Sequence, residues 1–228
     1  MDRAILDALG VERRARRAAF VITPLGDGEP RLVKAAEIAG DPDAERLATA
    51  LRDGRSRLIE DDRGARFIDA HIPEARLVVI GAVHISQMLY PMAIAAGYDV
   101  TIIDPRTAFA TPERFAGVKL VEKWPQEVLG EAGLDSHSAV VALTHDPKID
   151  DPALIAALRA DCFYIGALGS RKTHGRRVER LAAEGFSDTD IGKIHAPVGL
   201  DIGAVSPAEI AIAILAEITA VRRKGPGA

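Results

Sequence analysis

An apolar, strand-like run ends at Gly81, and a helix-like segment begins directly after it. The free backbone N–H groups of such a helix start, together with Gly81, Ala82 and His84, could bind an anion. A G-x-G-x-x-G fingerprint would also place glycine where this chain has Val83 and Ser86. The spacing therefore predicts a dinucleotide-binding fold, but the methyl groups of Val83 would crowd a pyrophosphate laid across the turn.

The next apolar run ends in an acidic residue, Asp104, which lies 23 residues after Gly81. In dinucleotide-binding folds an acid at roughly 20 residues from the first glycine holds the ribose hydroxyl groups. Arg106 follows two residues later and could take a phosphate group. We predict that both residues contribute to cofactor binding. The alternative is a capped turn with an exposed arginine.

Four polar side chains follow a later apolar run: Thr144, His145, Asp146 and Lys148. A neighbouring histidine and aspartate can relay a proton, so His145 and Asp146 are the candidate catalytic pair. Thr144 and His145 could also contact a bound cofactor, and Lys148 could hold an anion. The alternative is an Asx-type turn that leads into a helix beginning at Pro152.

A glycine-rich turn between a strand and a helix, at residues 166–172, contains Gly169, Ser170 and Arg171. The helix start, the hydroxyl group and the guanidinium group form a second candidate oxyanion site. We expect this turn to hold a phosphate better than the turn at Gly81 does. It is not a P-loop, because the glycine spacing and the G-K-S/T ending are absent. The alternative is a tight connection in which the serine only caps the helix.

The segment 195–203 is dense in turn-forming residues and carries two polar side chains, His195 and Asp201. It leads into Ser206-Pro-Ala-Glu209, which has the sequence of a capping box at a helix start. The segment could close one wall of a ligand pocket and bring both polar side chains to it. A purely structural loop is the alternative interpretation.

A regular alternation of strands and helices from residue 76 onward must position these side chains. The expected strands are 77–80, 100–103, 118–121, 139–143 and 163–165, and the expected helices are 84–96, 125–131, 152–159, 170–183 and 207–222. Short apolar strands between amphipathic helices indicate an α/β fold, a Rossmann-like doubly wound parallel sheet covered on both faces. Ligands of such folds bind beyond the carboxyl ends of the strands. We therefore expect the turns after the strands to converge on one pocket.

The first part of the chain has a different pattern, without a recognisable chemical motif. It predicts a small α+β region with helices at 2–10 and from Asp41 to about Leu51, and hairpins at 19–24/31–36 and 57–60/65–70. We therefore predict two domains, a small α+β N-terminal region at 1–75 and a Rossmann-like domain at 76–228.

The composition excludes several classes of function. A net charge of −4 and an aromatic content of 4% disfavour a nucleic-acid partner. No apolar stretch approaches the roughly 20 residues of a membrane-spanning helix, and we find no signal peptide, so we expect a cytoplasmic protein. The single cysteine, Cys162, excludes a disulfide within the chain, and the histidines lack metal-ligand spacing, so no metal site is expected.

Five sequence blocks occur in a characteristic order. They are Gly81-Ala-Val-His-Ile85, Thr144-His-Asp146, Tyr164-Ile-Gly-Ala-Leu-Gly-Ser-Arg171, Ile194-His-Ala-Pro-Val-Gly-Leu-Asp-Ile-Gly203 and Ser206-Pro-Ala-Glu-Ile-Ala211. Together they resemble the C-terminal Rossmann domain of the XdhC/CoxI family over about residues 76–224. The first block departs from the G-A-G-H-V of many members. Residues 1–75 also lack the S-G-G-C segment of the usual N-terminal domain, so we expect a short form of the family.

The resemblance implies an accessory protein that binds the molybdenum cofactor, molybdopterin, as cargo during sulfuration and delivers it to a molybdenum hydroxylase of the xanthine or CO dehydrogenase type. It implies a cofactor-insertion chaperone rather than a metabolic enzyme. The partners it implies are the hydroxylase apoenzyme, a cysteine desulfurase and a second copy of the chain. The cofactor-binding residues carried over are Gly81, Ala82, His84, Asp104, Arg106, Thr144, His145, Gly169, Ser170, Arg171, His195 and Asp201. Helix N-termini and Arg171 suit the terminal phosphate of the cofactor.

Two other functions stay open at this stage. An NAD(P)-dependent oxidoreductase is favoured by Gly81 and Asp104, and it is weakened by Val83 and Ser86. A nucleotide-binding regulatory domain could use the same strand–helix–strand unit without catalysis. NAD(P) is therefore the alternative cofactor.

Overall fold

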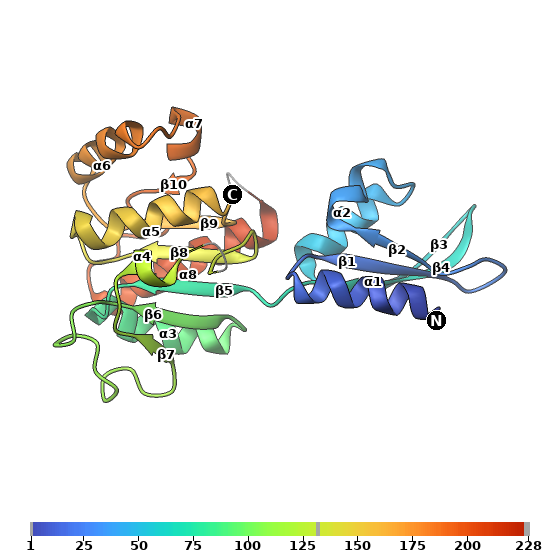
Figure 1. Ribbon diagram of the computed structural model, residues 1–228, viewed down its shortest axis with the longest axis horizontal. Coiled ribbons are helices and arrows are strands. Elements are labelled where there is room, and N and C mark those ends of the chain that lie inside the picture. The colour runs from blue at the N-terminus through green and yellow to red at the C-terminus, as the bar shows by residue number, and fades with distance from the viewer. Residues whose placement is uncertain (1, 131–132, 226–228) are drawn as a thin grey trace. The chain divides into compact units, whose positions relative to one another are not determined.

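The computed structural model describes residues 2–130 and 133–225 of the chain. The chain divides into two compact units, residues 1–73 and 74–228, each built on its own sheet (Figure 1). Among the described residues, no helix is both long enough and apolar enough to cross a membrane.

The N-terminal unit is a four-stranded antiparallel sheet in the order β2-β1-β4-β3. Its elements are α1 (Arg3–Arg14), β1 (Ala19–Pro24), β2 (Arg31–Lys34), the 3-10 helix η1 (Ala35–Gly40), α2 (Ala44–Asp53), β3 (Arg57–Asp61) and β4 (Gly64–His71). Both predicted hairpins are confirmed, because β1 pairs with β2 and β3 pairs with β4. The first helix does not end at Gly10 as we expected, since one glycine inside a helix costs only about 1 kcal/mol.

The C-terminal unit contains a six-stranded parallel sheet in the order β10-β9-β8-β5-β6-β7. The strands are β5 (Arg76–Ile80), β6 (Asp99–Ile103), β7 (Lys119–Val121), β8 (Ser138–Ala142), β9 (Tyr164–Ala167) and β10 (Ile194–His195). The first strand of the unit, β5, lies in the middle, and the order of strands reverses between β5 and β8. This is the strand order of a Rossmann fold, so the predicted α/β class is confirmed.

Helices cover both faces of this sheet (Figure 1). They are α3 (His84–Ala95), α4 (Pro125–Val128), α5 (Pro147–Arg159), α6 (Arg171–Ala183), α7 (Asp188–Ile191) and α8 (Pro207–Lys224). Val79 and Val141 belong to one buried cluster with residues of α3 and α8. Val78 and Val140 belong to a second cluster with residues of α5 and α6. Alternate residues of each central strand thus face opposite layers, which explains why these strands are continuous apolar runs.

Four elements of the C-terminal unit differ from the expected ones. Helix α5 begins at Pro147 rather than at Pro152, because the carboxylate of Asp146 accepts a hydrogen bond from the Lys148 N–H and caps the helix five residues earlier. Strand β10 and helix α7 are too short to show a period in the sequence, and we did not predict them. Helix α4 ends at Val128, and the predicted extension to 131 reaches outside the described residues.

Candidate functional site

The turns that follow the parallel strands lie at one edge of the C-terminal sheet. Strands β5, β8, β9 and β10 are parallel neighbours, so their carboxyl ends point the same way. A Cβ atom on Gly81 would lie 2.8 Å from Cγ2 of Thr144, which places the turns after β5 and β8 in contact. The N–H of Val198 donates to the carbonyl O of Ala167, which joins the segment after β10 to the end of β9. The four predicted segments therefore share this carboxyl edge.

The turn at Gly81 is closed by hydrogen bonds within the chain. Gly81 has a φ of +112°, a conformation that favours glycine. The Ala82 N–H donates to Oδ2 of Asp104 at 2.7 Å, and the Val83 N–H donates to Oγ of Ser86 at 2.8 Å. Ser86 is fully buried and donates in turn to the carbonyl O of Gly81. Two amides of the predicted anion site are thus already bonded, while His84 is exposed at the start of α3.

Asp104 and Arg106 form a bidentate ion pair at the end of β6. The guanidinium donates from Nε to Oδ1 at 2.9 Å and from Nη2 to Oδ2 at 2.8 Å, and it lies over the ring of Phe109. Burial alone would raise the pKa of Asp104, but the bonds from Arg106 and from the Ala82 N–H hold it below its ordinary value. The carboxylate, which is fully buried, therefore ties two turns together within the chain.

The turn after β8 is organised by a buried acid, Asp150 of α5. Its carboxylate accepts hydrogen bonds from the N–H and the hydroxyl of Thr144 and from the N–H of His145. Burial raises the pKa of Asp150 despite these donors. His145 has a φ of +63°, which is rare for a side chain other than glycine. No hydrogen bond joins the side chains of His145 and Asp146 in the described part of the chain, and Asp146 instead caps α5.

The turn after β9 leads into α6 through a capped start. Gly169 has a φ of +138°, and the Oγ of Ser170 accepts a hydrogen bond from the Thr173 N–H at 3.2 Å. The helix N-terminus therefore faces the carboxyl edge, as an anion site requires. Arg171 is exposed and does not line the cavity beside this turn.

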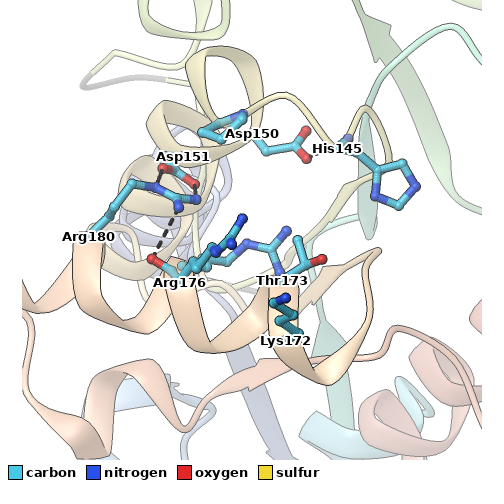
Figure 2. Close-up of a pocket in the computed structure, with 9 residues that line it drawn as sticks. His145, Asp150, Asp151, Lys172, Thr173, Arg176 and Arg180 are labelled. Atoms are coloured by element: carbon cyan, nitrogen blue, oxygen red, sulfur yellow. Dashed lines mark hydrogen bonds and ion pairs between the residues drawn. The ribbon is translucent and has the colours of Figure 1, made fainter.

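A cavity of about 450 Å³ lies between α5 and α6 at this edge (Figure 2). Nine residues line it: His145, Pro147, Asp150, Asp151, Lys172, Thr173, Arg176, Arg177 and Arg180. Figure 2 shows His145 and the two acids on one side, with Lys172, Thr173, Arg176 and Arg180 on the side of α6. Four cations face two carboxylates, so the cavity carries a positive charge. Of the predicted site residues, His145 alone lines it.

Three basic side chains of α6 that line the cavity, Arg176, Arg177 and Arg180, were not among the predicted site residues. Thr173, Arg176, Arg177 and Arg180 follow the spacing i, i+3, i+4 and i+7, which places side chains on one face of a helix. That spacing is visible in the sequence and could have identified these residues as one face of a helix. Arg180 forms a bidentate pair with Asp151, whereas the side chains of Lys172 and Arg176 form no ion pair within the described ranges.

His195 lies on the other face of the sheet, against α8. Its Nδ1 is 3.1 Å from Oε1 of Glu217, and its ring stacks on Tyr164 with 4.7 Å between the ring centroids. The hydroxyl of Tyr164 and the N–H of Gly199 donate to Oε2 of Glu217. Asp201 is exposed in the following loop. The predicted site residues thus share one edge of the sheet but divide between its two faces.

Glu217 was also missed, although its sequence position gives a signal. It is an acid within the apolar run of α8, beside the buried Ile214 and Ile218. Burial would raise its pKa, but the hydrogen bonds from His195, Tyr164 and Gly199 outweigh burial and lower it. Among the described residues, no cluster of three or more His, Cys, Asp or Glu side chains could hold a metal ion.

The fold and this edge define a Rossmann-type protein with a basic cavity beyond its strands. Residues 77–218 match the XdhC Rossmann domain, and the chain belongs to that family.

Two curated relatives and one solved structure extend this result. The chain is 34% identical over 150 residues to a protein of Escherichia coli (strain K12) named molybdenum cofactor insertion chaperone PaoD, covering 66% of this chain and 41% of that one. It is 31% identical over 159 residues to a probable xanthine dehydrogenase subunit of Bacillus subtilis (strain 168), covering 69% and 46%. The chain therefore spans less than half the length of these relatives. A crystal structure titled as a xanthine dehydrogenase from Bacillus halodurans shares the fold with a TM-score of 0.64 at 22% identity, covering 99% of this chain and 64% of that one.

Proposed function

We propose that this chain binds the molybdenum cofactor and delivers it to a molybdenum hydroxylase of the xanthine or CO dehydrogenase type. The observation that carries the proposal is the family match, which covers the sheet, its carboxyl-edge turns and the basic cavity. One relative named for cofactor insertion and another named for xanthine dehydrogenase support the same role.

The chemistry of the carboxyl edge suits this cargo. Molybdopterin carries a terminal phosphate, a polar ring system and a dithiolene that holds the metal. The cations of α6 and the helix start at Ser170 can hold the phosphate, because anions bind at helix N-termini and beside guanidinium groups. Residues of the same turns remain the proposed contacts for the rest of the molecule: Gly81, His84, Thr144, His145, Gly169, Ser170, Arg171, His195 and Asp201. Ala82, Asp104 and Arg106 are bonded to one another, so they are not proposed as contacts.

A carrier must release its cargo, and the thiol of this chain suits release. Cys162 is buried before β9, and burial raises the pKa of its thiol to about 12. Because Cys162 precedes β9, it lies at the amino edge of the sheet, opposite the cavity, so no cysteine of the described residues is placed to bind the molybdenum. From the family match and the relative named for cofactor insertion, we propose a cofactor-insertion chaperone rather than an enzyme that turns over the cofactor.

The proposed partner is the hydroxylase apoenzyme. A cysteine desulfurase that supplies sulfur to the bound cofactor and a second copy of the chain are further partners that we propose from the family resemblance. These associations are measured by size-exclusion chromatography with light scattering of the chain alone and of the chain mixed with each purified partner.

A transfer experiment tests the function. The purified chain is incubated with molybdenum cofactor, separated from unbound cofactor and mixed with a hydroxylase apoenzyme. The proposal predicts that the loaded chain activates the apoenzyme faster than the same amount of free cofactor does. Equal activation by free cofactor and by the loaded chain would contradict it.

A second candidate, an NAD(P)-dependent oxidoreductase, is favoured by the strand order and by the positive φ of Gly81. The bonds that already occupy Asp104 and the Ala82 and Val83 amides oppose it, because a dinucleotide would need those groups. Titration with NADH and NADPH separates the two functions. Tight binding with hydride transfer to an added acceptor supports the oxidoreductase.

A further inference from the structure

The guanidinium of Arg177 is buried, and no carboxylate of the described residues lies within ion-pair distance of it. Only 2% of the residue is exposed, and its Nη2 donates one hydrogen bond, at 3.0 Å, to the carbonyl O of Leu168. The Nε and Nη1 atoms are buried and have no hydrogen-bond partner in the described part of the chain. Burying a charge is unfavourable unless an opposite charge or hydrogen bonds compensate for it. Two buried N–H-bearing atoms of Arg177 therefore lack the hydrogen-bond acceptors that would compensate for burial of the charge.

The carboxylates that line the same cavity do not accept hydrogen bonds from Arg177. Asp150 accepts its hydrogen bonds from Thr144 and His145, and Asp151 is paired with Arg180. Neither acid forms an ion pair with Arg177 among the described residues. The charges of Asp150 and Asp151 act on the guanidinium from a distance, but its Nε and Nη1 atoms lack an acceptor among the described residues, and an anion from outside the chain can supply one.

We propose that the cavity between α5 and α6 is a binding site for a phosphate monoester, recognised by Arg177 from within and neutralised by Lys172 and Arg176 at the cavity wall. A phosphate offers several strong acceptor oxygens, and the planar fork of an arginine binds two of them at once. The start of α6 adds the positive end of a helix dipole to the same place.

The dimensions and contacts of the cavity fit this ligand class. A volume of about 450 Å³ admits a phosphate together with part of the molecule that it is attached to. Arg177 lines the cavity, and its Nε and Nη1 atoms are buried and have no hydrogen-bond partner among the described residues. Binding of a phosphate oxygen by these atoms requires the guanidinium to turn toward the cavity. That turn breaks no ion pair, because the bond to Leu168 is the one side-chain bond that holds Arg177 among the described residues.

This inference rests on the proposed function for the identity of the ligand, since the monoester would be the terminal phosphate of the cargo. The site itself is independent of that identity and can be tested with simple probes. It also replaces the exposed Arg171 with Arg177 as the main phosphate contact.

Calorimetric titration of the full chain with glycerol 3-phosphate, and with glycerol as the uncharged control, tests the site. We expect glycerol 3-phosphate to bind and glycerol not to bind. Arg177→Met should weaken binding about tenfold or more, because charge-assisted bonds are lost. Arg177→Lys keeps the positive charge but loses the planar guanidinium group. Its affinity for glycerol 3-phosphate should therefore lie between that of the unchanged chain and that of Arg177→Met. Lys119→Met removes an exposed cation of β7, the edge strand opposite β10, and this variant should bind glycerol 3-phosphate as the unchanged chain does.

Lys172→Met keeps the test decisive if Arg177→Met fails to fold, because Lys172 is exposed. We expect it to weaken binding about threefold. The site is overturned if glycerol 3-phosphate binds no better than glycerol, or if both variants bind like the unchanged chain. Binding of inorganic phosphate without binding of glycerol 3-phosphate would also overturn a monoester site.

The same variants separate this inference from the proposed function. If the unchanged chain binds and delivers molybdenum cofactor and Arg177→Met does so equally well, the phosphate site is wrong and the function stands. If glycerol 3-phosphate binding depends on Arg177 but molybdenum cofactor does not bind, the site stands and the function is wrong.

Discussion

At the scale of single residues, Gly81 shows why the first turn tolerates no side chain. Its φ is +112°, and an added Cβ would lie 2.8 Å from Cγ2 of Thr144. Gly97 also has a positive φ, +85°, but nothing lies within 4 Å of its added Cβ. A side chain at either position would strain the backbone, but only a side chain at Gly81 would also clash with a neighbour. Comparing alanine substitutions at the two positions therefore separates the two effects.

We predict that Gly81→Ala lowers the free energy of unfolding by about 1–3 kcal/mol more than Gly97→Ala does, because overpacking adds to the strain. Urea unfolding of both variants measures the difference. Equal losses would mean that Thr144 moves aside without cost and that the two turns are not tightly coupled.

Asp146 is the residue for which capping and catalysis make opposite predictions. As the N-cap of α5 it needs only a side-chain oxygen, which asparagine also provides. We predict that Asp146→Asn retains both stability and cofactor transfer, whereas Asp146→Ala loses about 1 kcal/mol of unfolding free energy. A stable Asp146→Asn variant that no longer transfers cofactor would instead establish a chemical role for the carboxylate.

Residue types could be read from the sequence, but their partners could not. The acid at the end of the second strand was predicted to hold a ligand, and in the structure Asp104 binds Arg106 and the Ala82 amide. The sequence predicts that the Val83 methyl groups keep a pyrophosphate from the turn. The structure shows a second obstacle, because the Val83 N–H already donates a hydrogen bond to the hydroxyl of Ser86. Such pairings depend on the approach of neighbouring turns, which spacing along the chain does not encode.

At the scale of elements, Glu217 joins α8 to the ends of β9 and β10. It accepts hydrogen bonds from Tyr164 and Gly199 and pairs with His195. Its pKa lies below the ordinary 4.5 in the folded chain. The carboxylate therefore stabilises the fold above the unfolded-state pKa, and this contribution is lost as the pH falls through the folded-state pKa.

We predict that Glu217→Gln lowers the free energy of unfolding at neutral pH by about 1–3 kcal/mol. The loss of stability on acidification should also become less steep in the variant. Urea unfolding across the acidic range measures both effects, with the exposed Glu122→Gln as the matched control. If Glu217→Gln and Glu122→Gln have the same acid dependence, the three-element junction does not depend on the charge of Glu217.

Elements with a clear period or cap could be predicted, and those without either could not. The capping box at Ser206 and Glu209 placed the start of α8 correctly. Pro152 predicts a helix start, but Asp146 and Pro147 form an earlier one, so the predicted start of α5 is wrong. Strand β10 has two residues and is defined by pairing with β9, which is a tertiary contact.

At the scale of the whole molecule, each buried apolar cluster lies within one of the two units. The clusters around Phe20 and Leu9 draw their described residues from the N-terminal unit. The clusters on the two faces of the parallel sheet draw theirs from the C-terminal unit. A unit with its own core can fold alone.

We predict that residues 74–228 expressed alone fold and unfold in one cooperative transition, because both faces of their sheet are covered within the unit. Circular dichroism during urea unfolding measures this, with the full chain as the control. A fragment without a cooperative transition would mean that the parallel sheet needs residues 1–73 to be stable.

The central claim is that the carboxyl edge of the parallel sheet carries a phosphorylated molybdenum cofactor. The most direct measurement is the amount of pterin that remains bound after the full chain is mixed with molybdenum cofactor and passed through a desalting column. The account predicts retention in proportion to the protein, with retention strongly reduced in Arg177→Met. Retention no greater than that of an unrelated protein of similar charge would contradict it.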